Sequence, residues 1–319
     1  MENSPRSALT VILNTFFICI VVYFIEYKFF YVRTVTIFGT TIINKLFAIV
    51  AVFLILRYLK TSWKSIGYVV KSKKIISGII TPLVILGVCA VVSFIFIKLL
   101  VESQGASLDI KYYISASSLD PHGATSPSII SVIINVFSVL ITSIMLETLL
   151  RGFVLQTANK YFRFYAANTI NVILTIVWHS IIYIFRITFG NMDVSVFIMS
   201  LLYTAIIYST AAVRKSLYIR ASGAIWACLV DCFLSLLIIH NLPITITLPT
   251  DFTVTNPIGY LVSFMSTRAS NSSYATIAFI CMVNVLSLIV MIVYCSILKK
   301  KARKKYIKRL SRNNATEKN

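Results

Sequence analysis

Long runs of apolar residues, separated by short polar segments, are the main pattern of this sequence. A helix needs about 20 apolar residues to cross the hydrocarbon core of a bilayer. Eight runs reach that length: 8–27, 35–57, 76–100, 128–150, 165–185, 194–213, 221–240 and 274–298. Because backbone groups cannot go unpaired in lipid, such runs must be helical. The pattern therefore predicts an all-α fold, a polytopic transmembrane bundle of about eight helices.

The composition supports a lipid environment. Of the 319 residues, 58% are hydrophobic and only 13% are charged, whereas a soluble domain carries about 25% charged residues. The polar stretches between the runs are too short to fold as separate domains.

The positive charges are distributed unevenly along the chain. The net charge is +20, which in a soluble protein would suggest nucleic acid as a partner. Here the basic residues gather in short segments between apolar runs, at 57–74, 151–163 and 214–220 and after 298. The opposite loops, 101–127 and 241–273, carry only Lys111 and Arg268. The positive-inside rule then predicts a multi-pass cell-membrane protein with both termini in the cytoplasm, the lipid bilayer as its partner and no nucleic acid.

The six cysteines give no sign of a metal centre. All lie inside apolar runs, and none has metal-ligand spacing with a histidine. Cys228 and Cys232 share one helix face, but two thiols alone do not make a zinc site. We interpret the cysteines as small buried apolar residues.

Ionisable residues inside membrane spans are costly, and each is therefore a candidate for function. Lys98 lies near the end of its span, where its side chain can reach the interface. Lys45 lies deeper, and its partner is not evident from the sequence. Glu147 and Arg151 end the fourth span, four residues apart, so that they can pair on one helix face.

Two further candidates lie in the middle of later spans. His179 can give and take protons near neutral pH, and Asp231 needs a partner or a proton at that depth. Each also has a purely structural interpretation: an interfacial ion pair for Glu147 and Arg151, a hydrogen-bonded neutral His179, or a protonated Asp231. Together, an acid, a base and a cation on three helices suit a hydrolytic or proton-handling site.

These residues resemble the motifs of the CPBP family of intramembrane proteases, also called the CAAX protease, bacteriocin-processing or Abi family. The stretch from Leu146 to Phe153 is similar to the family's Glu-Glu-x-x-x-Arg-Gly motif except at the first Glu. The stretch Thr175–His179 is similar to Phe-x-x-x-His without the Phe. Trp63–Gly67, which leads into Lys73, Lys74 and an apolar span, looks like the family's usual segment at that place.

The third motif of the family, His-x-x-x-Asn, is the weakest match. Gly223 and Trp226 resemble the residues that precede it, and Asp231 and Ser235 then stand at the His and Asn positions. A shift of one residue would place Cys232 and Leu236 there instead. The resemblance divides the chain into two N-terminal helices (1–59), a CPBP-like bundle (60–240), an exterior loop with the last transmembrane helix (241–298) and a basic cytoplasmic tail (299–319).

The resemblance implies an endopeptidase that cleaves membrane-associated peptide or protein segments. Glu147 and Arg151 would then fill the second Glu and the Arg of the first motif, His179 would activate water, and Asp231 would stand at an oxyanion position. Two departures oppose activity. Leu146, in place of the leading Glu, cannot accept a proton, and an ionised Asp231 can only accept hydrogen bonds. Losing both the general base and the oxyanion donor costs several kcal/mol of transition-state stabilisation, which lowers the rate on the order of many thousand-fold.

Three classes of function stay open from the sequence. The first is an active peptidase with Glu147 as the base and Asp231 as a second acid. In that case Glu147, His179 and Asp231 could also bind a divalent metal such as zinc. The second is an inactive family member that serves in binding, regulation or bacteriocin self-immunity. The third is an unrelated transporter or proton-coupled carrier that uses Glu147, His179 and Asp231, which the lack of paired repeats disfavours.

Overall fold

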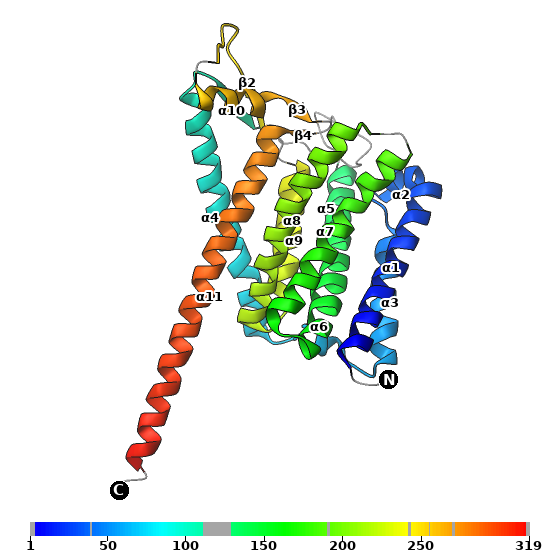
Figure 1. Ribbon diagram of the computed structural model, residues 1–319, viewed down its shortest axis with the longest axis vertical. Helices are drawn as coiled ribbons and strands as arrows, with labels where there is room; N and C mark the ends of the chain where they lie inside the picture. Colours follow the sequence, from blue (N-terminus) through cyan, green and yellow to red (C-terminus); the bar gives the residue numbers. More distant parts are fainter. Residues whose placement is uncertain are drawn as a thin grey trace.

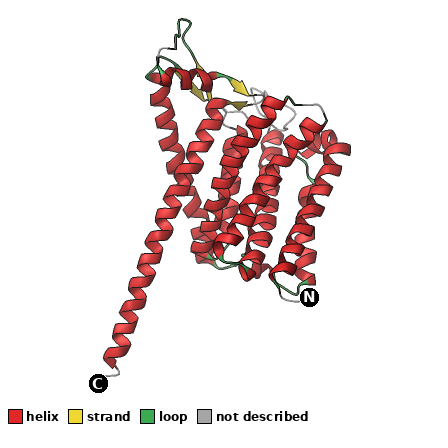
Figure 2. Cartoon of the chain, viewed as in Figure 1, coloured by secondary structure: helices red, strands yellow, loops and turns green. Residues whose placement is uncertain are grey.

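The computed structural model describes residues 4–38, 40–110, 129–189, 192–241, 244–254, 256–269 and 272–316. It is a bundle of helices that run roughly side by side, with the few strands gathered at one end (Figures 1 and 2). We call this the upper end, as drawn, and the end where the first helix begins the lower end. The prediction of an all-α bundle is confirmed in its class.

Eleven α-helices occur in the described ranges: α1 (Pro5–Phe29), α2 (Tyr31–Phe38), α3 (Ile43–Tyr58), α4 (Ser72–Glu102), α5 (Ile129–Leu146), α6 (Gln156–Tyr161), α7 (Phe164–Thr188), α8 (Val194–Ser222), α9 (Trp226–Asn241), α10 (Pro257–Ser266) and α11 (Tyr274–Thr316). A 3₁₀ turn, η1 (Trp63–Ile66), precedes α4, and a π-helix, η2 (Glu147–Leu155), joins α5 to α6. In the described part of the chain, six helical stretches are long and apolar enough to cross a membrane, namely α1, α4, the continuous α5–η2–α6, α7, α8 and α11.

Two predicted spans are divided or shortened in the structure. The run 35–57 is divided between α2 and α3, and α3 has 16 residues. The run 221–240 corresponds to α9, which begins only at Trp226 and also has 16 residues. These two helices are shorter than the six long ones, so the count of eight crossings depends on them.

The prediction of a basic loop at 214–220 is wrong. These residues belong to α8, which continues to Ser222 and ends at Gly223 in the left-handed conformation. Arg214 and Lys215 are buried. Both find acidic partners inside the bundle, described below, and therefore do not need to reach water.

The upper end carries secondary structure within the predicted exterior loops. Strand β1 (Ser107–Ile110) pairs antiparallel with β2 (Ile244–Thr247), so that the two long loops are joined. Strands β3 (Arg268–Ala269) and β4 (Ser272–Ser273) form a short hairpin before α11. Lys111, which was counted in the charge comparison, lies outside the described residues.

The packing of α4 against α9 requires a glycine. A Cβ atom added at Gly78 would lie 2.6 Å from the Cβ of Trp226, closer than carbon atoms can approach. The Trp226 indole donates a hydrogen bond of 2.9 Å to the Val69 carbonyl. The start of α9 is therefore fixed both to α4 and to the segment that leads into it.

Lys45, unexplained by the sequence, lies beside a buried carboxylate. Glu26 of α1 accepts hydrogen bonds from the backbone N–H groups of Ile42, Ile43 and Asn44 at 2.7–2.9 Å. These donors begin α3, and a helix start leaves such groups without partners of its own. The Lys45 ammonium bonds the Thr40 hydroxyl and lies within electrostatic range of Glu26. Lys98, by contrast, is half-exposed.

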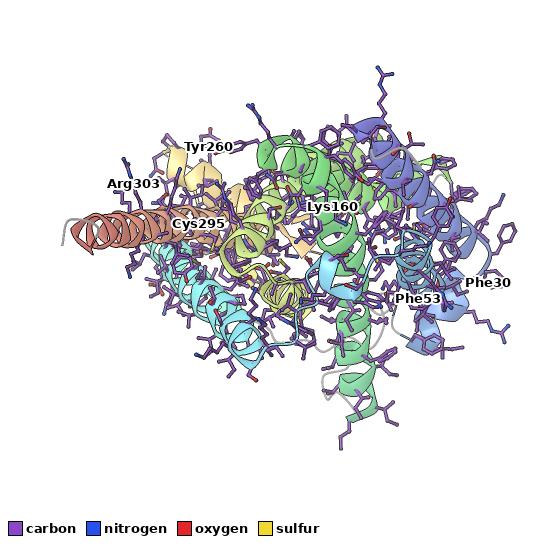
Figure 3. All side chains as sticks on the ribbon, turned by 90° about the horizontal axis from the view of Figure 1, so that it is seen from below. Phe30, Phe53, Lys160, Tyr260, Cys295 and Arg303 are labelled. Carbon is purple, nitrogen blue, oxygen red and sulfur yellow. The ribbon has the colours of Figure 1, made fainter. Side chains whose placement is uncertain are left out.

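Helix α11 is longer than any membrane crossing requires. Its 43 residues span about 65 Å at 1.5 Å per residue, roughly twice the hydrocarbon thickness of a bilayer. It packs against α4 and α8 and then projects past the lower end of the bundle (Figure 1). Figure 3, seen from below, shows Cys295 and Arg303 along this helix, at one side of the bundle.

Candidate functional site

The first site residue lies at a change of helix type. The backbone winds as a π-helix from Glu147 to Leu155, and all nine residues are buried. π-Helical segments within α-helices are frequent at functional sites. Here the segment carries the Glu-x-x-x-Arg sequence. The Glu147 and Arg151 side chains form the ion pair that their spacing predicts, with 3.7 Å between Oε2 and Nε.

Glu147 makes its shorter contact with a residue that the sequence analysis placed in a loop. The Lys215 ammonium on α8 donates a 2.7 Å hydrogen bond to Glu147 Oε1. The Lys215 Nζ atom is also 3.9 Å from Asp231 Oδ1, so one lysine bridges both candidate carboxylates. The other Glu147 oxygen, Oε2, has no hydrogen-bond partner among the described residues.

Both carboxylate oxygens of Asp231 accept hydrogen bonds from one arginine. The Arg214 guanidinium donates from Nε to Oδ2 and from Nη2 to Oδ1, both at 2.8 Å. Its remaining nitrogen, Nη1, donates to Asn284 Oδ1 and to Ser287 Oγ on α11, both at 2.7 Å. Both members of the pair are fully buried. This fork geometry makes full use of the planar guanidinium and ties α8, α9 and α11 together.

His179 lies beside the ion pairs rather than within them. Its ring stacks on the Tyr208 ring, with centroids 3.5 Å apart and planes 6° from parallel. Arg151 and Lys215 lie within electrostatic range of it. Leu146, at the position of the family's leading Glu, is buried in the apolar core.

The described residues therefore bring three of the four predicted site residues into one buried network. Lys215 joins Glu147 to Asp231, Arg151 pairs with Glu147, and Arg214 pairs with Asp231. Two carboxylates face three cations. Sequence reasoning missed Arg214 and Lys215 because their neighbours resemble a cytoplasmic loop, and missed Tyr208 because one tyrosine in an apolar run gives no signal.

The network does not suit a divalent metal. Among the described residues, no three His, Cys, Asp or Glu side chains are close enough together to hold one. The oxygens of Asp231 and one oxygen of Glu147 already receive hydrogen bonds from cationic side chains. Cys228 donates through its thiol to the Lys215 carbonyl at 3.2 Å, and Cys232 contacts the Lys215 side chain. We find no arrangement here for the zinc set of Glu147, His179 and Asp231.

A tyrosine borders the network. The Tyr68 hydroxyl, in the segment between η1 and α4, is 2.6 Å from the Thr148 hydroxyl of η2. Burial raises the pKa of Tyr68, and its contact with Thr148 partly opposes that shift. The hydroxyl therefore stays protonated, and the contact ties the η1–α4 segment to η2.

The fold and the network define a multi-pass α-helical membrane protein with a buried, charged centre. The chain matches no protein-family model, no curated protein and no solved structure.

Proposed function

We propose that this chain is an eight-pass membrane protein of CPBP type in which a closed ion-pair network replaces the peptidase centre. Its role is to bind or regulate membrane-associated peptide or protein segments, with bacteriocin self-immunity as one example. Helices α3 and α9 supply the two crossings beyond the six long helices. The lower end, rich in Lys and Arg, faces the cytoplasm together with both termini.

One observation carries the proposal: every candidate carboxylate already pairs with a buried cation. A general base must reach the proton it removes, within about 2.6–3.2 Å or through one water. Glu147 is engaged by Lys215, Asp231 by Arg214, and Leu146 has no proton-accepting group. A charge pair of this kind stabilises the ionised carboxylate and occupies its oxygens. The carboxylate is then less able to take a proton from water, as a general base must.

An active peptidase is the second candidate, and one atom favours it. Glu147 Oε2 has no hydrogen-bond partner in the described part of the chain, although it is buried. Its ion pair with Arg151 Nε, at 3.7 Å, is longer than a hydrogen bond, and a buried polar atom without a hydrogen bond calls for an explanation. A water activated between this oxygen and His179 would provide one and would make Glu147 the base.

The deciding experiment measures binding and cleavage with the same peptides. Wild type, Glu147→Gln and His179→Ala are placed in proteoliposomes with a library of membrane-associated peptides, with and without a chelator. Retained peptides are identified by mass spectrometry, resynthesised and incubated at saturation. Circular dichroism and gel filtration confirm that each variant is folded. The glutamine can still accept a hydrogen bond from Lys215, so it changes charge with little change in shape.

The proposal expects retained peptides that stay intact with all three proteins. Cleavage by wild type that is lost in both variants would establish the peptidase instead, and sensitivity to the chelator would then assign a metal to it. Retention of no peptide above that of empty liposomes would count against a peptide-binding role.

A further inference from the structure

The lower end of the bundle contains a cavity that the ion-pair network does not use. It has a volume of about 400 Å³ and lies where η1, α6, the start of α7 and the end of α8 meet. Its polar lining includes Lys64, Ser65, Gln156, Asn159 and Arg220. Three segments that are distant in the sequence, η1, α6 and the end of α8, thus place two cations, two amides and a hydroxyl around one space.

The geometry of two glycines shapes this cavity. Gly67 and Gly223 both line it and both have positive φ angles, +98° and +65°, which L side chains rarely adopt. The Gly67 carbonyl accepts a 3.0 Å hydrogen bond from the Ile225 N–H. This bond connects the segment after η1 to the turn after α8. The walls are therefore fixed by backbone contacts and not only by surface side chains.

Arg220 is positioned to offer its donors to a ligand. Its guanidinium carbon lies 4.7 Å from the centroid of the Phe164 ring, over its face. Stacking of this kind fixes the plane of the guanidinium and leaves its N–H edges available. The Lys74 ammonium lies 3.2 Å from where a Cβ of Gly223 would stand, so a third cation borders the cavity.

The described segments that line the cavity contain no acidic residue to neutralise these cations. Residues 57–74, 151–164 and 214–225 include neither Asp nor Glu. The carboxylates of Glu147 and Asp231 lie inside the bundle and are occupied by Lys215 and Arg214. Lys160, labelled in Figure 3, adds to the positive charge of this face. A fixed cavity with unneutralised cations and amide donors suits an oxyanion.

We propose that this cavity binds a phosphate group, either of an anionic phospholipid headgroup or of a soluble phosphate. Arg220 and Lys64 supply charge-assisted hydrogen bonds to the phosphate oxygens. Gln156 and Asn159 add amide donors. The site is independent of peptide binding or cleavage at the ion-pair network.

The test uses the purified full chain in detergent. The midpoint of thermal unfolding is followed by tryptophan fluorescence during titration with phosphatidylglycerol or phosphatidylcholine. The pocket variant carries Lys64→Gln and Arg220→Gln. The matched control carries Lys71→Gln and Lys73→Gln, which also removes two exposed basic charges from the neighbouring segment but leaves the cavity lining intact. Unfolding midpoints without lipid show whether each variant is folded.

We expect phosphatidylglycerol to stabilise wild type and the control, with half-saturation at least about tenfold higher in the pocket variant. Competition by inorganic phosphate at constant ionic strength would assign the site to the free oxyanion, and its absence would assign it to the lipid headgroup. Equal weakening in the pocket variant and the control would show general charge attraction and overturn the proposal. Equal stabilisation by phosphatidylcholine would also overturn it.

Discussion

The pair of Arg214 and Asp231 allows a quantitative test of the buried network. Replacing Asp231 by Leu leaves a fully buried guanidinium without its counter-charge. Removal of one member of a buried ion pair costs about 3–5 kcal/mol. The unfolding equilibrium constant should therefore change by roughly two to three and a half orders of magnitude. Arg214→Met should cost somewhat less, because Asp231 then keeps the Lys215 ammonium, 3.9 Å away, as its remaining counter-charge.

The double variant, Arg214→Met with Asp231→Leu, should lose far less than the sum of the two single changes. Replacing both members by apolar residues of similar volume is often close to neutral. A residual cost of about 1–3 kcal/mol is expected because Asn284 Oδ1 loses its buried donor. The two single variants and the double variant thus form a double-mutant cycle with a large coupling energy.

The assay is denaturant unfolding in mixed micelles, followed by tryptophan fluorescence and circular dichroism. Glu102→Leu is the control, because Glu102 pairs with Lys98 at 3.7 Å on a half-exposed surface. Such a pair contributes at most about 1 kcal/mol. The reasoning is refuted if Asp231→Leu costs no more than this control, or if the two single effects simply add in the double variant.

Three further predictions follow from other contacts. Gly78→Ala should destabilise the protein by about 1–3 kcal/mol, because its Cβ would collide with Trp226. Gly87→Ala on the same helix has open space and should be neutral or slightly stabilising; equal effects of the two changes in thermal unfolding would contradict the close packing. Glu26→Gln should cost about 1.5–3 kcal/mol, since it weakens the bonds to the start of α3, and denaturant unfolding would expose a smaller cost. A chelator should leave the unfolding midpoint unchanged, and a lowered midpoint would reveal a structural metal.

The helices could be predicted because hydropathy is a local property of the chain. An apolar run of sufficient length indicates a membrane helix without knowledge of any other segment. The strands β1 and β2 could not be predicted in the same way. Each has four residues, and their pairing joins Ser107 to Thr247, which are far apart in the sequence. Runs of this length carry too little periodicity to be recognised.

The two acids of the site and Arg151 were predicted, whereas Arg214 and Lys215 were missed. Glu147 and Asp231 stood out because a carboxylate within an apolar run is unusual. Arg214 and Lys215 resembled a cytoplasmic loop because they are followed by Arg220 and polar residues. Composition cannot distinguish a cation that reaches water from one that pairs with a carboxylate 68 residues away. Glu26 was overlooked although it lies in the run 8–27, because it stands one residue from the end of that run and the N–H groups that it binds lie in another segment.

The separation of the ion pairs along the chain has a consequence for how the protein enters the membrane. Asp231 follows Arg214 by 17 residues, so α8 and α9 can enter as one hairpin with these two charges already paired. Placing either charge alone at the centre of a bilayer would cost about 2.5–3.5 kcal/mol even on the insertion scale. Lys215 has its shorter ion pair with Glu147, which is 68 residues earlier in the chain. Glu147 therefore leaves the ribosome before Lys215. The hairpin can therefore pair its remaining cation, Lys215, with Glu147 only after the segment that carries Glu147 has been inserted. Assembly of the bundle then has a fixed order.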